Sequence, residues 1–228
     1  MAYLLEGLKQ GLELLLPPGR EILQIVALSL VVSGTATVLA SLAAIPSALF
    51  LALKEFPGKR LVVGLVNTAM AVPAVLIGLL VYGLVSRRGP LGTLGLLFTP
   101  GAMVLAQALL AFPLITALAL AALKGVARDA RDLALSLGAN RGQLAAAVIR
   151  QGRFAFLTAI IAGFSRVIGE TGMTLMIGGN IKGQTRVLTT AISLETMKGN
   201  FEIGIALGIV LLLVALAINI ALQAVQGK

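Results

Sequence analysis

Two ionisable residues, Arg166 and Glu170, lie inside a long apolar stretch of this 228-residue chain. They are four residues apart, so on a helix both side chains project from one face. Ionised groups in the hydrocarbon of a membrane cost roughly 2.5–3.5 kcal/mol each on insertion scales, so they are expected to pair or to face a cavity. Two interpretations follow: a salt bridge that locks helices together, or a path along which an anion passes Arg166, with Thr171 and Thr174 beside it. The two are compatible if Glu170 holds Arg166 in a closed state.

A second segment with functional potential is the polar, basic stretch 124–153. Residues 128–137 favour a helix, Gly138 and Asn140 favour its end, and residues 143–149 favour a second helix that runs into the next apolar stretch. A short helix–turn–helix at the membrane surface, joined directly to a spanning helix, is a suitable contact for a partner protein. The alternative interpretation is a basic, solvated loop.

Several kinds of chemistry are excluded by residue types. The chain has no cysteine and no histidine, which excludes thiol chemistry, disulfides and His-ligated metal. No cluster of Asp and Glu predicts a metal site, so no metal or other cofactor is expected in this chain. The pattern GxxxxGK[ST] of a phosphate-binding loop is absent, so the chain is not expected to hydrolyse ATP or to be an enzyme.

The composition indicates an integral membrane protein. Apolar residues make up 58% of the chain and charged residues 12%, against about 45–50% and about 25% in soluble domains. Mean hydropathy is +1.02. The net charge of +9 does not indicate nucleic acid, because the basic residues lie between apolar stretches, as the positive-inside rule predicts. Membrane lipid is the expected surrounding.

The apolar stretches predict an all-α protein with about five transmembrane helices: 22–53, 61–86, 101–123, 154–178 and 204–224. Pro73 is expected to kink the second helix. Residues 1–20 form a separate N-terminal segment, whose leucines recur at helical spacing and predict an amphipathic helix at the membrane surface rather than a signal peptide. Residues 21–228 form the membrane domain, with a polar segment at 180–203.

The distribution of basic residues predicts the orientation. With 124–153 inside, ten Lys and Arg residues lie on the cytoplasmic face and seven on the outer face. The margin is small, so the density of six basic residues within 124–153 decides the choice, because such a segment is hard to translocate. The N-terminus is therefore expected outside, the C-terminus in the cytoplasm, and the segment 180–203 outside.

Small and hydroxyl residues mark expected helix contacts. Ala155, Ala159 and Gly163 form a small-xxx-small face, and Gly204 with Gly208 makes a GxxxG pair. In the first stretch, hydroxyl residues follow one another at a spacing of four: Ser29, Ser33, Thr37 and Ser41. This stripe is read as helix packing with hydroxyls bonded back to the helix, against the alternative of a pore lining.

The run from Asp132 to Ala139 resembles the "EAA" loop of ABC importer permeases. Asp132 takes the acidic position, Ala134 the second alanine and Gly138 the glycine, whereas Leu133 and Gln151 depart from the pattern. The resemblance implies a type I permease fold with a cytoplasmic coupling helix that fits a groove on an ATPase subunit. The residues it assigns to this coupling are Arg128, Arg131, Asp132, Ala134, Leu137, Gly138, Ala139, Asn140 and Arg141.

The stretch 163–193 resembles sulfate/molybdate-type permeases, and the runs 185–192 and 194–201 are similar to the tungstate-specific branch of that family. The resemblance implies a homodimer in the inner (cytoplasmic) membrane that imports tungstate or molybdate. It implies two ATP-binding cassette subunits, which hold ATP and Mg²⁺, and an extracytoplasmic oxyanion-binding protein. That protein would dock on Lys182, Arg186, Glu195 and Lys198, unless 180–203 is an ordinary solvated loop.

Two other functions are weighed. The first is an ABC permease for sulfate, another doubly charged tetrahedral anion. The second is an ion-coupled secondary transporter without an ATPase partner, which would need coupling groups at mid-membrane and usually has an internal repeat. The five stretches show no obvious repeat, and Arg166 with Glu170 is the one ionisable pair within them.

Overall fold

A computed structural model describes residues 19–136 and 139–226, and every regular element in this part of the chain is helical. Its elements, in chain order, are α2 (Arg20–Leu53), α3 (Lys59–Ala69), α4 (Ala74–Val85), η1 (Gly92–Leu94), α5 (Pro100–Ser136), α6 (Arg141–Ile168), α7 (Gly172–Gly178), α8 (Leu188–Met197) and α9 (Phe201–Gln226). The predicted all-α fold is confirmed. The amphipathic helix expected within 1–20 falls almost wholly on residues 1–18, outside the described residues.

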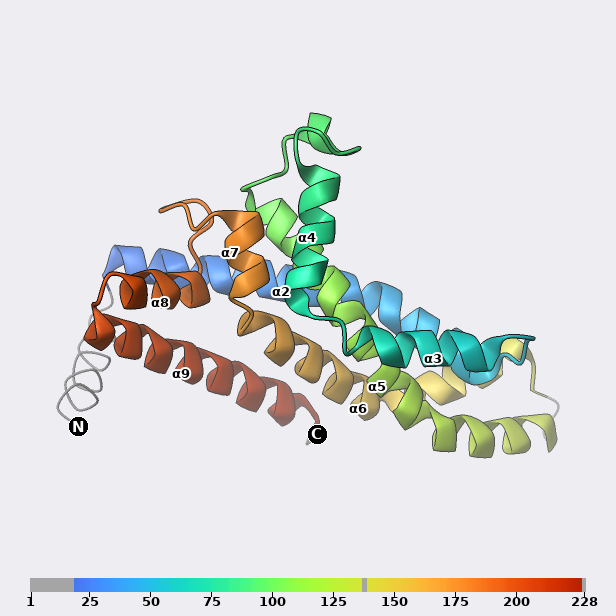
Figure 1. Cartoon of the computed structure of the whole chain (residues 1–228). Coiled ribbons are helices and arrows are strands. Elements are labelled where there is room, and N and C mark those ends of the chain that lie inside the picture. The colour runs from blue at the N-terminus through green and yellow to red at the C-terminus, as the bar shows by residue number, and fades with distance from the viewer. Residues whose placement is uncertain (1–18, 137–138, 227–228) are drawn as a thin grey trace.

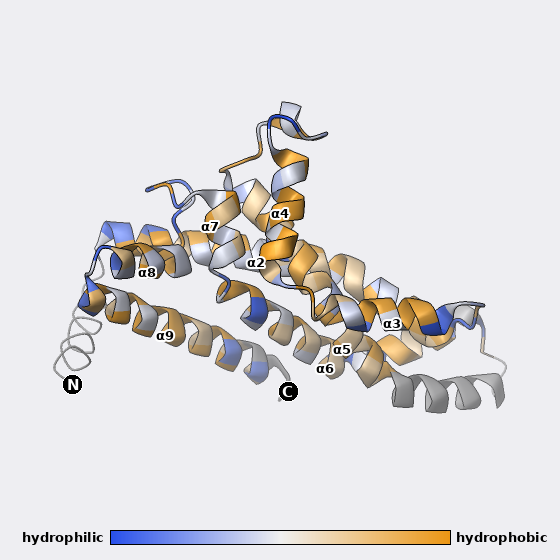
Figure 2. Ribbon diagram, in the orientation of Figure 1, coloured by the Kyte–Doolittle hydropathy of each residue, from blue (hydrophilic) through white to orange (hydrophobic). Residues whose placement is uncertain are grey.

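Four described helices are long and apolar enough to cross a membrane: Arg20–Leu53, Pro100–Leu123, Gly142–Ile168 and Phe201–Ala221. Their outward faces carry large exposed side chains such as Val31, Leu42 and Leu212, which lipid solvates at no cost. Figure 2 shows apolar residues along most of the length of the long helices. If the bent helix pair α3 and α4 is counted as one span, the described residues contain five spans, the number predicted.

The second predicted span, 61–86, is not one helix. It is two helices, α3 and α4, bent by 98°, and α4 rises away from the long helices in Figure 1. Pro73 is the residue before α4, and its carbonyl accepts the N–H of Leu76. Proline lacks an N–H and disfavours helical geometry in the preceding residue, so α3 ends at Ala69 before reaching it. The sequence predicted the place of the break but described it as a kink.

The helix expected at 128–137 is also different from the prediction. It is the end of α5, which runs without a break from Pro100 to Ser136. The second helix of this segment, expected from residue 143, starts at Arg141 and, as predicted, continues into the next apolar stretch, ending at Ile168. Asn140 caps it: its side-chain oxygen accepts the N–H of Gln143 at 2.9 Å, while its own N–H donates to the Gln143 side chain at 2.8 Å. This reciprocal pair is the capping box of helix starts.

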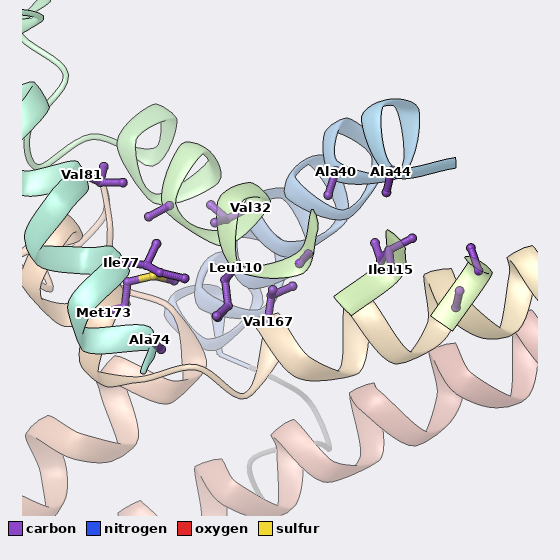
Figure 3. Packing of buried hydrophobic residues seen from close by; sticks show 14 of the residues in the cluster. Val32, Ala40, Ala44, Ala74, Ile77, Val81, Leu110, Ile115, Val167 and Met173 are labelled. Atoms are coloured by element: carbon purple, nitrogen blue, oxygen red, sulfur yellow. The ribbon is translucent and has the colours of Figure 1, made fainter. Parts of the chain in front are cut away.

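The main core lies between α2, α5 and α6, with α4 and α7 packed against one end of it (Figure 3). Alanines of α2, including Ala40 and Ala44, are buried and let the neighbouring backbone approach. Gly163 of α6 does the same, since a Cβ added there would lie 2.6 Å from the Ile115 side chain of α5. A smaller cluster joins α2, α8 and α9.

The predicted polar segment 180–203 is more ordered than a solvated loop. It contains α8, whose first four residues, 188–191, are buried. Thr190 caps the start of this helix, because its hydroxyl oxygen accepts the N–H of Val187 at 3.0 Å. The segment is therefore part of the packed structure, and it joins α7 to α9.

Candidate functional site

The ion pair predicted from the sequence is present at the end of α6. Arg166 Nη1 lies 3.0 Å from Glu170 Oε2. Arg166 is in the last turn of α6, whereas Glu170 lies past the end of that helix, in the three-residue break before α7. The prediction that both residues share one helix face is therefore wrong for Glu170, although the spacing of four still brings the charges together.

Glu170 connects three helices. Its Oε1 accepts the N–H of Met173 in the first turn of α7 at 3.4 Å, and its carbonyl accepts the hydroxyl of Thr189 in α8 at 3.1 Å. The side chain of Glu170 is 12% exposed and that of Arg166 is 43% exposed. The carboxylate is thus held by the protein, while nearly half of the Arg166 side chain is exposed.

The two threonines of the predicted site have different places. Thr171 is the residue immediately before α7. Thr174 is buried and faces α5, where its hydroxyl accepts a long hydrogen bond of 3.4 Å from Gln107 Nε2. Thr174 therefore belongs to a contact between α5 and α7 and does not join the ion pair.

Gln107 was missed by the sequence analysis. It is buried near the start of α5, and its Oε1 has no hydrogen-bond partner among the described residues. A single amide within an apolar span is the signal that would have found it, because polar groups at that depth are costly and tend to be functional.

The four residues expected to dock a binding protein form two neighbouring clusters. In the first, Lys182 Nζ lies 2.7 Å from Glu21 Oε2 and Arg186 Nη1 lies 3.6 Å from Glu21 Oε1. In the second, Glu195 binds Lys198 at 2.8 Å and the side-chain amide of Asn200 at 2.7 Å. Sequence reasoning missed Glu21 and Asn200, the partners in these clusters.

The charge state of the second cluster follows from its hydrogen bonds. The ammonium of Lys198 and then the amide of Asn200 hold the pKa of Glu195 below the usual value of a glutamate, because both donate to the ionised carboxylate. Glu195 is therefore a carboxylate at neutral pH, and it fixes the end of α8.

The hydroxyl stripe of α2 supports helix packing. Ser29, Thr37 and Ser41 are buried, and each donates to the carbonyl four residues earlier at 2.7 Å. This is the bonding expected of hydroxyls that satisfy themselves inside a helix, rather than of hydroxyls turned towards a pore.

Most of the predicted coupling residues lie where no side chain is described. Arg128, Arg131, Asp132 and Ala134 are on the helical backbone of α5, and Arg141 begins α6, but their side chains are outside the described structure. Leu137 and Gly138 are outside it altogether. Ala139 and Asn140 are described, and of these two Asn140 has the cap role given above. Within the described ranges no group of three or more His, Cys, Asp or Glu residues could hold a metal ion.

The structure combines long apolar helices with a basic segment between two of them and an ion pair at a helix break. These are the features of a multi-pass membrane protein with an internal polar site. The chain belongs to the family of binding-protein-dependent transport system inner membrane components, whose model matches residues 22–228. It is therefore a multi-pass inner membrane permease subunit of an ABC transporter, which is not itself an enzyme, and the system to which it belongs uses a binding protein.

Three relatives are similar over most of their length. The tungstate uptake system permease protein TupB of Peptoclostridium acidaminophilum is 39% identical over 228 residues, all of both chains. A probable anion ABC transporter permease protein of Haloferax volcanii is 42% identical over 203 residues, 87% of this chain and 88% of the relative. The TupB protein of Campylobacter jejuni is 38% identical over 217 residues, 95% of this chain and 91% of the relative.

Proposed function

We propose that this chain is the permease subunit of an ABC importer for tungstate, with molybdate as its nearest alternative substrate. The observation that carries the proposal is the similarity to a tungstate uptake permease, which is 39% identical over the full length of both chains. The Campylobacter jejuni relative has the same description. The anion would be delivered by an external binding protein, with the N-terminus outside and the C-terminus in the cytoplasm.

Two copies of the chain would form the pore, and two ATPase subunits would drive it through the segment 124–153. The geometry of α6 supports this route. The helix follows its N-cap Asn140 and runs for 28 residues, Arg141–Ile168, with Arg166 in its last turn next to the helix break. At 1.5 Å per residue, this rigid element is about 42 Å long, so a displacement at its cytoplasmic start moves the ion pair.

The ion pair would act as a gate on the anion path. The side chain of Arg166 is nearly half exposed, and Glu170 neutralises its charge at 3.0 Å. Because the pair has no net charge, a dianion would pass without being trapped, which suits a pore better than a tight site. Glu170 also holds the start of α7 and contacts α8, so a change at the pair would move both.

The external binding protein would dock near the end of α8. Glu195 and Lys198 form an ion pair there, and Lys198 is half exposed. Arg186 is mostly buried against Glu21, so it contributes less to a docking surface than the sequence alone suggests. Exposed charge pairs of this kind favour specificity and association rate over affinity.

Transport into proteoliposomes tests the substrate. Vesicles that contain the chain and its ATPase subunits, supplied with the binding protein, should accumulate tungstate in an ATP-dependent manner. Molybdate should compete, and sulfate in equal concentration should compete much less. Preferential uptake of sulfate would contradict the substrate assignment.

A bulky residue at Gly138 tests the coupling. The Gly138→Leu variant should lose uptake while remaining in the membrane, because a bulky side chain would replace the glycine of the EAA-like pattern. Gly208→Leu in α9 is a matched control, since nothing lies within 4 Å of a Cβ built at Gly208. Normal transport by Gly138→Leu would contradict the role of this segment.

A further inference from the structure

A cavity of about 370 Å³ lies between the first three turns of α2 and the segment 182–186. Its lining changes in character from one end to the other. At one end the cavity is lined by charged side chains: Glu21 from the start of α2, and Lys182 and Arg186 from the segment beside it. Further along α2, Leu28 and Val31 line the other end. The cavity is separate from the break that contains Glu170.

The charged end of the cavity carries a net positive charge. Among the described lining residues, Glu21 is the carboxylate shared by Lys182 at 2.7 Å and Arg186 at 3.6 Å, which leaves a net charge of +1. Arg186 Nε is buried and has no hydrogen-bond partner among the described residues. A buried charged donor without an acceptor is costly, so this end is suited to an oxygen of a bound anion.

The depth of the cavity matches one half of a bilayer. From Glu21 to Val31 its lining follows α2 for ten residues, about 15 Å at 1.5 Å per residue, whereas the whole hydrocarbon core is about 30 Å thick. Because α2 is a candidate membrane span that begins at Arg20, we expect the charged end at the membrane surface. The other end, where Val31 is exposed, would then lie among acyl chains.

We propose that this cavity binds one glycerophospholipid. Its phosphodiester would accept hydrogen bonds from Lys182 and Arg186, and one acyl chain would follow Ala27, Leu28 and Val31 of α2. Arginine and lysine are the residues that bind phosphate oxygens in this way. The bound lipid would fasten the segment 182–186 to α2, and this role does not depend on which anion is transported.

Charge and shape both favour a lipid over a free oxyanion. A phosphodiester carries one negative charge, which balances the net +1 of the lining, whereas tungstate or phosphate as a dianion would leave the site negative beside Glu21. A free oxyanion would also use the charged end alone and leave the apolar end in contact with water, which is unfavourable.

Lipid binding to the purified full-length chain in detergent micelles tests the proposal. Phosphatidylglycerol, added in steps, should remain bound in native mass spectrometry as one tight equivalent and should raise the thermal unfolding temperature. Diacylglycerol, which lacks the phosphodiester, and inorganic phosphate or tungstate, which lack acyl chains, should do neither. An equal effect of diacylglycerol, or of free phosphate or tungstate, would overturn the proposal.

Variants separate the two ends of the cavity. Lys182→Gln and Arg186→Gln should each weaken phosphatidylglycerol binding about tenfold, the worth of one charge-assisted hydrogen bond. Ala27→Phe should weaken it by obstructing the acyl end while leaving the charges in place. Lys198→Gln is the control. Lys198 forms an ion pair with Glu195 at 2.8 Å, much like that of Lys182, but it lies outside the cavity, so its loss should leave lipid binding unchanged.

If Arg186→Gln does not fold, Lys182→Gln and Ala27→Phe still decide the question, because both residues are exposed. Unchanged lipid binding in these two variants, or an equal loss in Lys198→Gln, would overturn the assignment.

Discussion

The side-chain oxygen of Ser29 accepts the backbone N–H of Leu188 at 2.8 Å, although the two residues are 159 positions apart. Both are buried. Leu188 is the first residue of α8, where backbone N–H groups have no partner within the helix. Ser29 thus caps α8 from another helix, and it still donates its own hydrogen to Ile25 of α2.

The Ser29→Ala variant should therefore be less stable than the wild type. It leaves a buried N–H without an acceptor, which costs about 1–3 kcal/mol. Thermal unfolding of the purified protein in detergent measures the change. Ser41→Ala is the control, because Ser41 is also buried and donates only within α2, to the carbonyl of Thr37. A loss of the same size in both variants would mean that the contact with α8 contributes nothing.

Gly163→Ala should destabilise the packing of α5 against α6. The added methyl would lie 2.6 Å from two atoms of the fully buried Ile115 side chain, and overpacking of this kind costs about 1–3 kcal/mol. Gly208→Ala in α9 meets open space, so its expected effect is neutral or slightly stabilising through helix propensity. Equal unfolding temperatures for the two variants would contradict the close contact.

The ion pair at the helix break allows a test that separates structure from transport. Arg166→Gln leaves the mostly buried Glu170 carboxylate without its cation and should cost about 1–3 kcal/mol in unfolding free energy. The double variant with Glu170→Gln should recover most of that stability, because neither charge is then unpaired.

Tungstate uptake by the wild type, Arg166→Gln and the double variant shows whether the ion pair has a second role, in transport. If Arg166 faces the anion path, the double variant should stay inactive although it is stable. A double variant with wild-type stability and wild-type uptake would mean that the ion pair is structural alone.

The contact at the end of α8 should depend on pH. The pKa of Glu195 is lowered in the folded protein by Lys198 and Asn200, so its ionised form stabilises the fold above the unfolded-state pKa. That contribution is lost as the pH falls through the lower folded-state pKa. The difference in unfolding temperature between wild type and Glu195→Gln should be constant from neutral pH to about pH 5 and shrink below that range. A difference that grows on acidification would contradict this sign.

Asn140→Ala should loosen the start of α6. The capping box with Gln143 is lost, and such caps are worth about 1 kcal/mol. If this start transmits the ATPase motion, the variant should also lower the coupling of ATP hydrolysis to uptake, measured as anion transported per ATP. Gln143→Ala removes the other half of the same box and should act in the same direction, whereas an unchanged ratio in both would contradict the coupling role.

Properties that depend on composition or on near neighbours were accessible from the sequence. Apolar runs of sufficient length predict membrane helices because lipid requires every backbone group to be satisfied within the helix. The pairing of Arg166 with Glu170 is a contact between residues four apart, so its spacing alone predicts it. The capping box of Asn140 with Gln143 is equally local, but the sequence analysis assigned Asn140 to the end of the preceding helix. The EAA-like run likewise indicated the permease family before any contact was known.

Other properties were decided by packing between segments far apart in the chain. Pro73 predicts a break, but the 98° angle between α3 and α4 depends on what each helix packs against. Nothing near Lys182 in the sequence indicates that its partner is Glu21, 161 residues away. In the same way, the cap that Ser29 provides to α8 and the contact of Gln107 with Thr174 exist because tertiary contacts bring lone polar groups together, and no local spacing encodes that.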